Sequence, residues 1–281
     1  MNGIIVVNKP KDYTSRDVVN KISKILGTKK VGHTGTLDPI ATGVLIITIG
    51  KYTKLCDMLT SEYKEYIATM KLGIETDTLD ITGKELSNKE YNVNEDQIKE
   101  VLNSFIGKSI QEVPKYSAIK VNGKRLYEYA RNNIDVELPK REIDIKYIDF
   151  MSYKDGYITF KTLVSKGTYI RSLIRDIAYK LNTVASMSEL IRTKQGIFNI
   201  EDSYTIEDIE NNKYKLLDIE DIFDDIEIYN IEDKDYVRLS NGSYMDNIFN
   251  SDKVLVKYKD KPIGLYILDR DKNIMKPYIM L

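Results

Sequence analysis

The pattern of apolar and polar positions divides the chain into short strands and helices. Continuous apolar runs at residues 4–7 and 44–49 predict strands that are buried on both faces. Apolar residues at helical spacing predict helices over residues 15–26, 94–106 and 170–181. A capping box precedes the first helix and a glycine follows it, so the sequence marks both of its ends.

Further strands are expected at residues 66–72, 143–150 and 157–164, with a turn at Asp155-Gly156 joining the last two. The strands and helices are interspersed, but they do not alternate regularly as βαβ units. This order favours a mixed α/β or α+β sheet over a doubly wound fold.

The pattern changes in the last part of the chain, where short β-like runs cover residues 254–258 and 263–268. Turns are expected at Asn241-Gly242 and Lys261-Pro262. A small β-rich domain at residues 226–281 is therefore predicted.

The composition limits the chemistry that the chain can perform. Cys56 is the only cysteine and His33 the only histidine, which excludes a disulfide framework and the usual cysteine and histidine zinc sites. No apolar run approaches the roughly 20 residues of a membrane-spanning helix, and the start lacks the features of a signal peptide. We therefore expect a cytoplasmic protein without a membrane partner.

The net charge of −1 conceals an uneven distribution. Residues 1–200 carry 31 Lys and Arg against 24 Asp and Glu, whereas residues 201–281 carry 11 against 19. The acidic run between Glu201 and Asp235 is typical of a solvated linker. The basic N-terminal part is compatible with a polyanionic partner.

Residues 32–43 combine three glycines, a proline, an aspartate and the only histidine in one connection, which is expected to lead from a helix to a strand. Glycines allow a ligand to approach the backbone closely, and Pro39 restricts the chain just after Asp38. Asp38 is therefore a candidate site residue. A turn aspartate that caps its own loop is the open alternative. A phosphate-cradling loop is disfavoured because no Gly-Lys-Ser/Thr sequence follows.

The segment from Gly32 to Leu45 resembles the central signature of the bacterial tRNA pseudouridine-55 synthase family, also called pseudouridine synthase II. Further segments resemble the family in the expected order, and together they cover about residues 1–200. They are residues 5–10 with Thr14-Ser15, residues 64–66 with 72–73 and 76–78, residues 111–131, and residues 166–172. The resemblance implies the α+β pseudouridine synthase fold, with helices flanking a mixed, largely antiparallel central sheet in residues 1–225. It also implies a PUA-like RNA-binding domain at residues 226–281.

The family isomerises uridine to pseudouridine at position 55 in the T-loop of tRNA, using a flipped base. The resemblance makes Asp38 the catalytic carboxylate, with attack at C1′, attack on the base and abstraction of a sugar proton as open alternatives. It makes Arg171 the partner of Asp38, and Tyr66 the ring that packs against the base and takes part in proton transfer. Without the resemblance, Arg171 would be interpreted as a surface helix residue and Tyr66 as a core residue.

Other positions match residues that contact the RNA in the family. The resemblance implies that His33 helps to occupy the space left by the flipped uridine, although it could be a plain loop histidine. Tyr169 is expected to line the pocket, and Lys9 of the opening motif to contact substrate. No metal or organic cofactor is implied, because the isomerisation is redox neutral.

Residues 116–137 are basic and aromatic and are predicted to form a surface arm. Lys120, Lys124, Arg125 and Arg131 are expected to bind phosphates of the T-arm stem-loop rather than to read bases. A solvated amphipathic helix is the alternative. No protein partner is implied, and a monomer is expected.

The match to the family is incomplete at two positions. Val113 stands where the family commonly has the first of two prolines, and Ile191 where it commonly has a second arginine. The family's local RNA contacts are therefore not carried over to these two positions. Three other functions remain in competition. They are an RNA-guided pseudouridine synthase, an RNA-binding module without catalysis and a nucleoside hydrolase. The short C-terminus without a basic tail favours stand-alone action, and the combination of Asp38, Tyr66 and Arg171 favours an enzyme.

Overall fold

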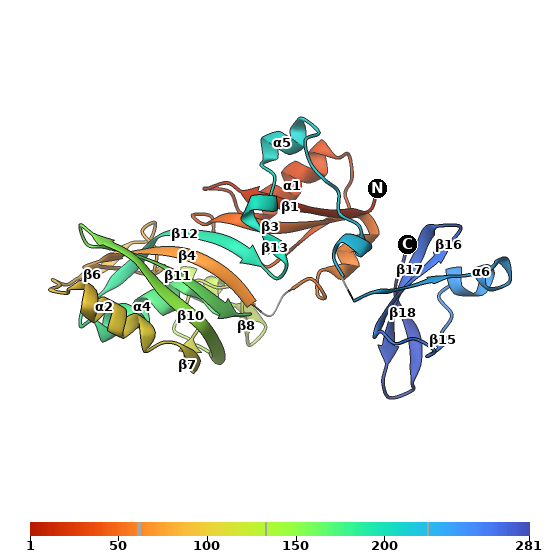
Figure 1. The fold of residues 1–281 in the computed structure, drawn as a ribbon. Helices are drawn as coiled ribbons and strands as arrows, with labels where there is room; N and C mark the ends of the chain where they lie inside the picture. The colour runs from red at the N-terminus through yellow and green to blue at the C-terminus, as the bar shows by residue number, and fades with distance from the viewer. Residues whose placement is uncertain (61–62, 133, 224) are drawn as a thin grey trace.

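The computed structural model describes residues 1–60, 63–132, 134–223 and 225–281 (Figure 1). Their largest sheet has nine strands, and all of its pairs are antiparallel except β3 with β12. The expected α+β fold with a mixed, largely antiparallel sheet is confirmed. Its main path runs through β1 (Gly3–Lys9), β3 (Thr42–Ile49), β12 (Ala185–Gln195), β4 (Tyr63–Leu72), β11 (Tyr157–Ser165), β10 (Lys140–Lys154) and β7 (Gly107–Glu112), with β2 (Val31–Thr34) beside β3 and β13 (Phe198–Asn199) beside β12.

Strands β1 and β3 are buried on both faces, as their continuous apolar runs predict. One face packs against α1 (Ser15–Ile25), and the other contributes to a core shared with the C-terminal domain. Helix α1 begins with the predicted capping box, in which Thr14 and Asp17 bind each other's backbone N–H groups. This cap defines the residue at which α1 begins after β1, close to the Asp38 loop.

The other half of the sheet is covered on one face by α2 (Glu95–Asn103) and α4 (Ile170–Lys180), whose buried side chains share one core with those of β4, β10 and β11. Strand β4 alternates between buried and partly exposed residues, as expected for a sheet with one covered face. The predicted helices and the hairpin at Asp155-Gly156 are confirmed. Helix α2 ends three residues earlier than predicted.

Three local predictions are corrected by the structure. Residues 31–34 form strand β2, so the glycine-rich segment is not a simple loop from helix to strand. Lys261-Pro262 begins strand β17 (Lys261–Asp269), and the turn lies two residues earlier, at Lys259-Asp260, where both φ angles are positive. The acidic segment is more than a solvated linker. Most of its described carboxylates are exposed, but Tyr204 and Leu217 form backbone hydrogen bonds along the edge of β1.

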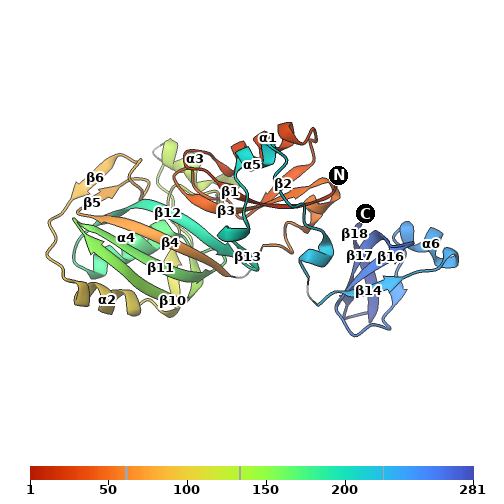
Figure 2. The ribbon, with the colours of Figure 1, turned by 45° about the horizontal axis from the view of Figure 1, so that its top comes forward.

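The C-terminal domain is a separate five-stranded sheet with one helix, which confirms that this part is rich in β structure. In both views it lies beside the end of the larger sheet that carries β1 and β3 (Figure 1, Figure 2). No helix within the described ranges is both long enough and apolar enough to cross a bilayer. The domain consists of β14 (Glu227–Asn230), β16 (Lys253–Tyr258), β17, β18 (Ile274–Met280), β15 (Met245–Asp246) and α6 (Asp233–Ser240).

The parallel contact between β3 and β12 depends on Gly43. Its φ is +99°, and a Cβ atom there would lie 2.2 Å from the carbonyl oxygen of Arg192. We expect Gly43→Ala to lower the free energy of unfolding by more than about 3 kcal/mol, because backbone would have to move. Urea unfolding measures this. Gly27→Ala is the control, since Gly27 also has a positive φ but open space around it, and should cost only about 1–2 kcal/mol.

Candidate active site

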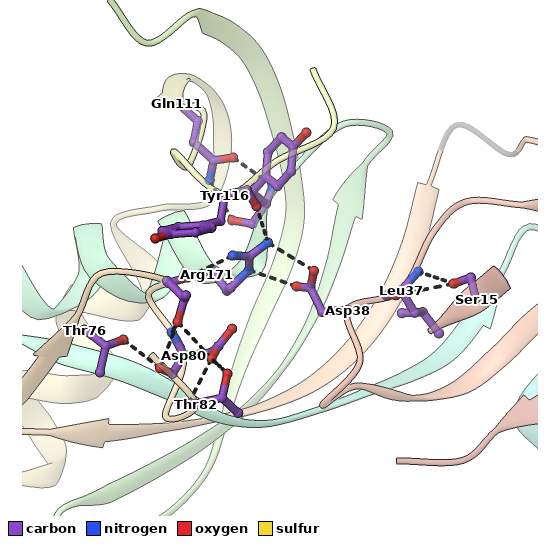
Figure 3. A network of polar contacts seen from close by, with 11 residues as sticks. Ser15, Leu37, Asp38, Thr76, Asp80, Thr82, Gln111, Tyr116 and Arg171 are labelled. Atoms are coloured by element: carbon purple, nitrogen blue, oxygen red, sulfur yellow. Dashed lines mark hydrogen bonds and ion pairs between the residues drawn. The ribbon is translucent and has the colours of Figure 1, made fainter. Parts of the chain in front are cut away.

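The loop that carries Asp38 runs from β2 to β3 and is held from several directions. Ser15 at the start of α1 accepts a hydrogen bond from the backbone N–H of Leu37 at 2.9 Å (Figure 3). Lys9 Nζ donates to the carbonyl of Pro39 at 3.2 Å, and Arg192 Nη2 donates to the carbonyl of Gly35 at 2.8 Å. The loop is therefore fixed on both sides of Asp38 before any ligand binds.

Arg171, near the start of α4, binds the carboxylate of Asp38 with two of its nitrogens. Arg171 Nε lies 2.8 Å from Oδ2, and Nη2 donates to Oδ1 at 3.1 Å (Figure 3). Such a paired contact fixes the orientation of a carboxylate as well as its position. In the described parts of the chain no loop N–H group bonds the Asp38 carboxylate, so Asp38 is not capping its own turn.

Two further N–H groups of Arg171 hold its side chain in place. Nη1 donates to the carbonyl of Thr78 at 2.8 Å, and Nη2 also donates to the carbonyl of Tyr116 at 3.1 Å. The side chain of Arg171 is 7% exposed, whereas that of Asp38 is 33% exposed. Arg171 is therefore a buried positioning group, and Asp38 presents its carboxylate to the outside.

The carbonyl of Thr78 is itself fixed by a buried aspartate. Asp80 Oδ1 accepts hydrogen bonds from Thr78 Oγ1 and from the backbone N–H of Thr82, each at 3.0 Å. Thr76 Oγ1 donates to the carbonyl of Asp80 at 2.6 Å (Figure 3). Asp80 was not among the predicted site residues, because a short polar turn of this kind is common on protein surfaces.

Tyr66 lies on the covered face of β4 and belongs to the same apolar cluster as Leu37, Ile40 and Ala41 of the Asp38 loop. It is therefore a core residue of the cluster that also contains these three residues of the Asp38 loop. Within the described ranges its hydroxyl has no hydrogen-bond partner, so that group remains available to a ligand.

His33 lies on β2, opposite Ile47 of β3, and is half-buried. Burial lowers the pKa of its imidazole, and the charges of Arg16 and Arg192 lower it further, so the ring is neutral at pH 7. A neutral ring offers a stacking surface but no charge for a phosphate. This state fits the predicted role in filling the space of a flipped base.

Tyr169 and Lys9 have structural partners. Tyr169 precedes α4, and its backbone N–H and carbonyl both bind the side chain of Gln111, at 2.8 and 3.1 Å. Lys9 is fully buried, and its ammonium donates to three carbonyls, including that of Pro39. The other two carbonyls, of Pro10 and Tyr13, lie in the connection between β1 and α1. All three N–H donors are therefore used by carbonyls of the chain, and none is free for substrate.

The predicted arm projects from the site as a small hairpin, β8 (Lys120–Val121) with β9 (Lys124–Arg125), followed by α3 (Leu126–Arg131). Lys120, Lys124, Arg125 and Arg131 are all exposed. The guanidinium groups of Arg125 and Arg131 lie 5.8 and 5.4 Å from the ring centre of Tyr127. Because Tyr116 at the base of the arm bonds Arg171, the arm and the carboxylate are connected.

Two family descriptions match the chain. "TruB family pseudouridylate synthase (N terminal domain)" matches residues 23–170, and "tRNA pseudouridylate synthase B C-terminal domain" matches residues 171–228. The "tRNA pseudouridine synthase B" of Fusobacterium nucleatum is 44% identical over 287 residues, which cover 99% of each chain. The protein of the same name from Clostridium novyi is 50% identical over 238 residues, 84% of this chain and 81% of the relative.

Solved structures show the same fold. A chain in the "Crystal Structure of a Cbf5-Nop10-Gar1 Complex" superposes with a TM-score of 0.69 at 28% identity, covering 95% of this chain and 78% of that one. A chain in the "Structure of H/ACA RNP bound to a substrate RNA containing 2'-deoxyuridine" gives a TM-score of 0.68 at 25% identity, covering 99% and 83%. The α+β pseudouridine synthase fold implied by the family resemblance is therefore confirmed.

Proposed function

The chain belongs to the TruB family of pseudouridylate synthases, and on that premise we propose that it isomerises uridine 55 in the T-loop of tRNA with Asp38 as the catalytic carboxylate. The observation that carries this proposal is the paired contact of a buried Arg171 with a partly exposed Asp38. A binding module has no need of a carboxylate that is oriented by a buried guanidinium and presented to the outside.

The isomerisation exchanges one bond of the base for another. The C1′–N1 bond breaks, the uracil turns, and a C1′–C5 bond forms while C5 loses its proton and N1 gains one. No electrons enter or leave, so the reaction needs a positioned carboxylate, a surface for the base and exclusion of water. Asp38, the ring of Tyr66 and the apolar residues Leu37 and Ile40 supply these three requirements.

The base must leave the RNA stack before Asp38 can reach its sugar. Stacking on an aromatic ring is worth roughly 1–3 kcal/mol per base, which offsets part of the cost of unstacking. Tyr66, which shares a core cluster with residues of the Asp38 loop, provides such a ring, and the neutral His33 provides a second flat surface. Both assignments rest on the family resemblance together with the positions that the two rings occupy.

The sequence identities favour a tRNA substrate over a guide-dependent one. Relatives named tRNA pseudouridine synthase B are 44% and 50% identical to this chain, whereas the chains from the Cbf5-Nop10-Gar1 complex and from the H/ACA RNP are 28% and 25% identical. We therefore propose tRNA, through its T-arm stem-loop, as the substrate.

A test of the function uses a T-arm stem-loop that carries tritium at C5 of uridine 55 only. The wild-type protein alone should release tritium to water in proportion to pseudouridine formed. A stem-loop labelled at a different loop uridine is the control and should release none. Absence of release from the RNA labelled at uridine 55 would contradict the proposed function. Release only from the RNA labelled at the other uridine would show that the enzyme acts on that uridine instead.

The arm is proposed to bind the RNA backbone. We expect Lys124→Glu combined with Arg125→Glu to weaken stem-loop binding by about tenfold or more at low salt, because two phosphate contacts become repulsive. The slope of log Kd against log salt should fall by about two. Lys154→Glu is the control, because Lys154 is the last residue of β10 and the arm precedes the first residue of that strand, Lys140. This variant should change neither the Kd nor the salt slope. An unchanged Kd for the double variant at low salt would show that the arm does not contact the RNA.

A further inference from the structure

Two carbonyls hold the guanidinium of Arg171, and they belong to separate segments of the chain. Nη1 donates to Thr78, in the turn that follows β5 (Ile74–Thr76), and Nη2 donates to Tyr116 at the base of the arm (Figure 3). The same Nη2 group also donates to Asp38 Oδ1. The separation of the two segments therefore affects the angle at which Arg171 meets the carboxylate.

One side-chain hydrogen bond joins these two segments. The hydroxyl of Tyr116 donates to Asp77 Oδ2 at 3.1 Å, and Asp77 directly precedes Thr78. Asp77 is itself fixed, because its Oδ1 accepts a hydrogen bond from the backbone N–H of Lys84 at 2.8 Å. The turn closes tightly around it, since a Cβ atom at Gly83 would lie 2.5 Å from Asp77 Oδ1. The phenol is therefore bound to a fixed acceptor, one residue away from the first carbonyl.

Packing leaves the separation of the two segments open. A cavity of about 490 Å³ lies between them, and its lining includes Leu86 of β6 (Glu85–Asn88) on one side and Leu126 of the arm on the other. Asp77 and Tyr116 both lie at its wall. Close-packed side chains resist displacement, but groups on opposite sides of a cavity do not support each other. The hydrogen bond between Tyr116 and Asp77 is a direct contact across this space.

The strand that leads into the arm is tied to α4 before it reaches the cavity. The side chain of Gln111 binds the backbone N–H and carbonyl of Tyr169, and Ser172 Oγ donates to the carbonyl of Glu112 at 2.9 Å. Glu112 lies four residues before Tyr116 in the chain. The position of the Tyr116 carbonyl therefore depends on contacts that Tyr116 makes itself.

We propose that Tyr116 and Asp77 are positioning residues for the reaction, and that their hydrogen bond keeps Arg171 aligned with the catalytic carboxylate. In this role neither side chain contacts the substrate. Burial raises the pKa of the Tyr116 hydroxyl, and the Asp77 carboxylate raises it further, so the group stays protonated and donates at neutral pH. The inference rests on the proposed function, because the reaction whose rate it concerns is the one proposed above.

The test begins with Tyr116→Phe, which removes the hydroxyl and leaves the backbone carbonyl that Arg171 binds. Single-turnover tritium release should fall about tenfold, with Kd for the stem-loop within about twofold of wild type, because a hydrogen bond to a carboxylate is lost away from the RNA. Asp77→Ala should lower the rate at least as much, and the double variant should be no slower than Asp77→Ala. In an Arg171→Lys background, Tyr116→Phe should cost less than about twofold, since no guanidinium is left to align.

Tyr179→Phe is the matched control. The hydroxyl of Tyr179, on α4, donates to Glu75 Oε1 at 2.7 Å, so this variant also removes a hydrogen bond between a tyrosine and a carboxylate of the β5 region. Glu75 lies two residues before Asp77, and its bond to α4 does not pass through the arm. The rate of tritium release by Tyr179→Phe should equal that of the wild type.

Three kinetic results would overturn the proposal. The first is a Tyr116→Phe rate within about twofold of wild type, whether or not the melting temperature falls, because the bond would then serve stability alone. The second is a weaker Kd with an unchanged rate, which would make the hydroxyl an RNA contact. The third is a loss that multiplies with that of Arg171→Lys, which would show that Tyr116 acts independently of Arg171.

A second measurement tests the same coupling without any activity. Urea unfolding of Tyr116→Phe, Arg171→Lys and their double variant should give losses of stability that are smaller together than the sum of the two single losses. Additive losses would overturn the proposal. Release by the wild type is measured first, so a wild type without release would contradict the proposed function, while the unfolding cycle would still decide whether Tyr116 and Arg171 are coupled.

Discussion

Asp38→Asn is expected to reduce tritium release from the labelled stem-loop by at least about 10³-fold, with Kd for the RNA within about threefold of wild type. Asparagine has nearly the same shape as aspartate but carries no negative charge and cannot act as a nucleophile or base. The change therefore removes the chemistry while the loop remains held by Ser15, Lys9 and Arg192. Single-turnover release with saturating enzyme separates the chemical step from binding.

The control for this variant is its folding. Arg171 keeps its hydrogen bonds to the carbonyls of Thr78 and Tyr116, so Asp38→Asn should stay folded at the assay temperature. Circular dichroism melting would detect a loss of structure. Equal rates of release from wild type and Asp38→Asn would show that Asp38 is not the catalytic group, whatever the protein does to the RNA.

Where apolar periodicity was strong, the sequence predicted the fold well. Strands β1 and β3 follow from continuous apolar runs, and α1 follows from its capping box and its spacing. The hairpin of β10 and β11 follows from its turn at Asp155-Gly156. In these elements, local propensity and burial favour the same structure.

The pattern of apolar and polar positions did not predict strand β12, although β12 lies between β3 and β4 in the sheet. Arg192 and Gln195 are both fully buried there, so polar side chains occupy positions at which a buried strand would normally be apolar. Their partners, the carbonyl of Gly35 and the hydroxyl of Thr34, are more than 150 residues away in the chain. Periodicity cannot indicate such pairs, because they exist only after the sheet has formed.

The candidate site shows the same limit. Composition and spacing raised Asp38 only to a candidate, with a turn aspartate as the alternative, and family resemblance assigned Arg171 to it. The structure brings these two residues together from positions 133 residues apart. It also adds Ser15, Asp80 and Arg192, whose roles depend on backbone carbonyls and N–H groups that a sequence does not display.

Arg171→Lys is expected to lower the single-turnover rate by about 10²-fold, with little change in Kd for the stem-loop. The guanidinium of Arg171 reaches two carboxylate oxygens and two carbonyls at once. A lysine ammonium has its three donors at a single point and cannot span these four acceptors. The variant should keep a positive charge near Asp38 but lose the orientation of the carboxylate, so a large loss of rate would identify geometry as the contribution of Arg171.

The same substitution should lower the free energy of unfolding by about 1–3 kcal/mol, because at least one buried carbonyl loses its partner. Arg175→Lys is the matched control, since Arg175 lies one turn further along α4 and pairs with Glu112 and Asp176. It should leave the rate unchanged. If Arg171→Lys lost stability but kept the wild-type rate, Arg171 would serve only to tie α4 to the arm and to the Thr78 turn. Loss of rate in the Arg171 variant alone would place the orientation of Asp38 among the requirements of the reaction.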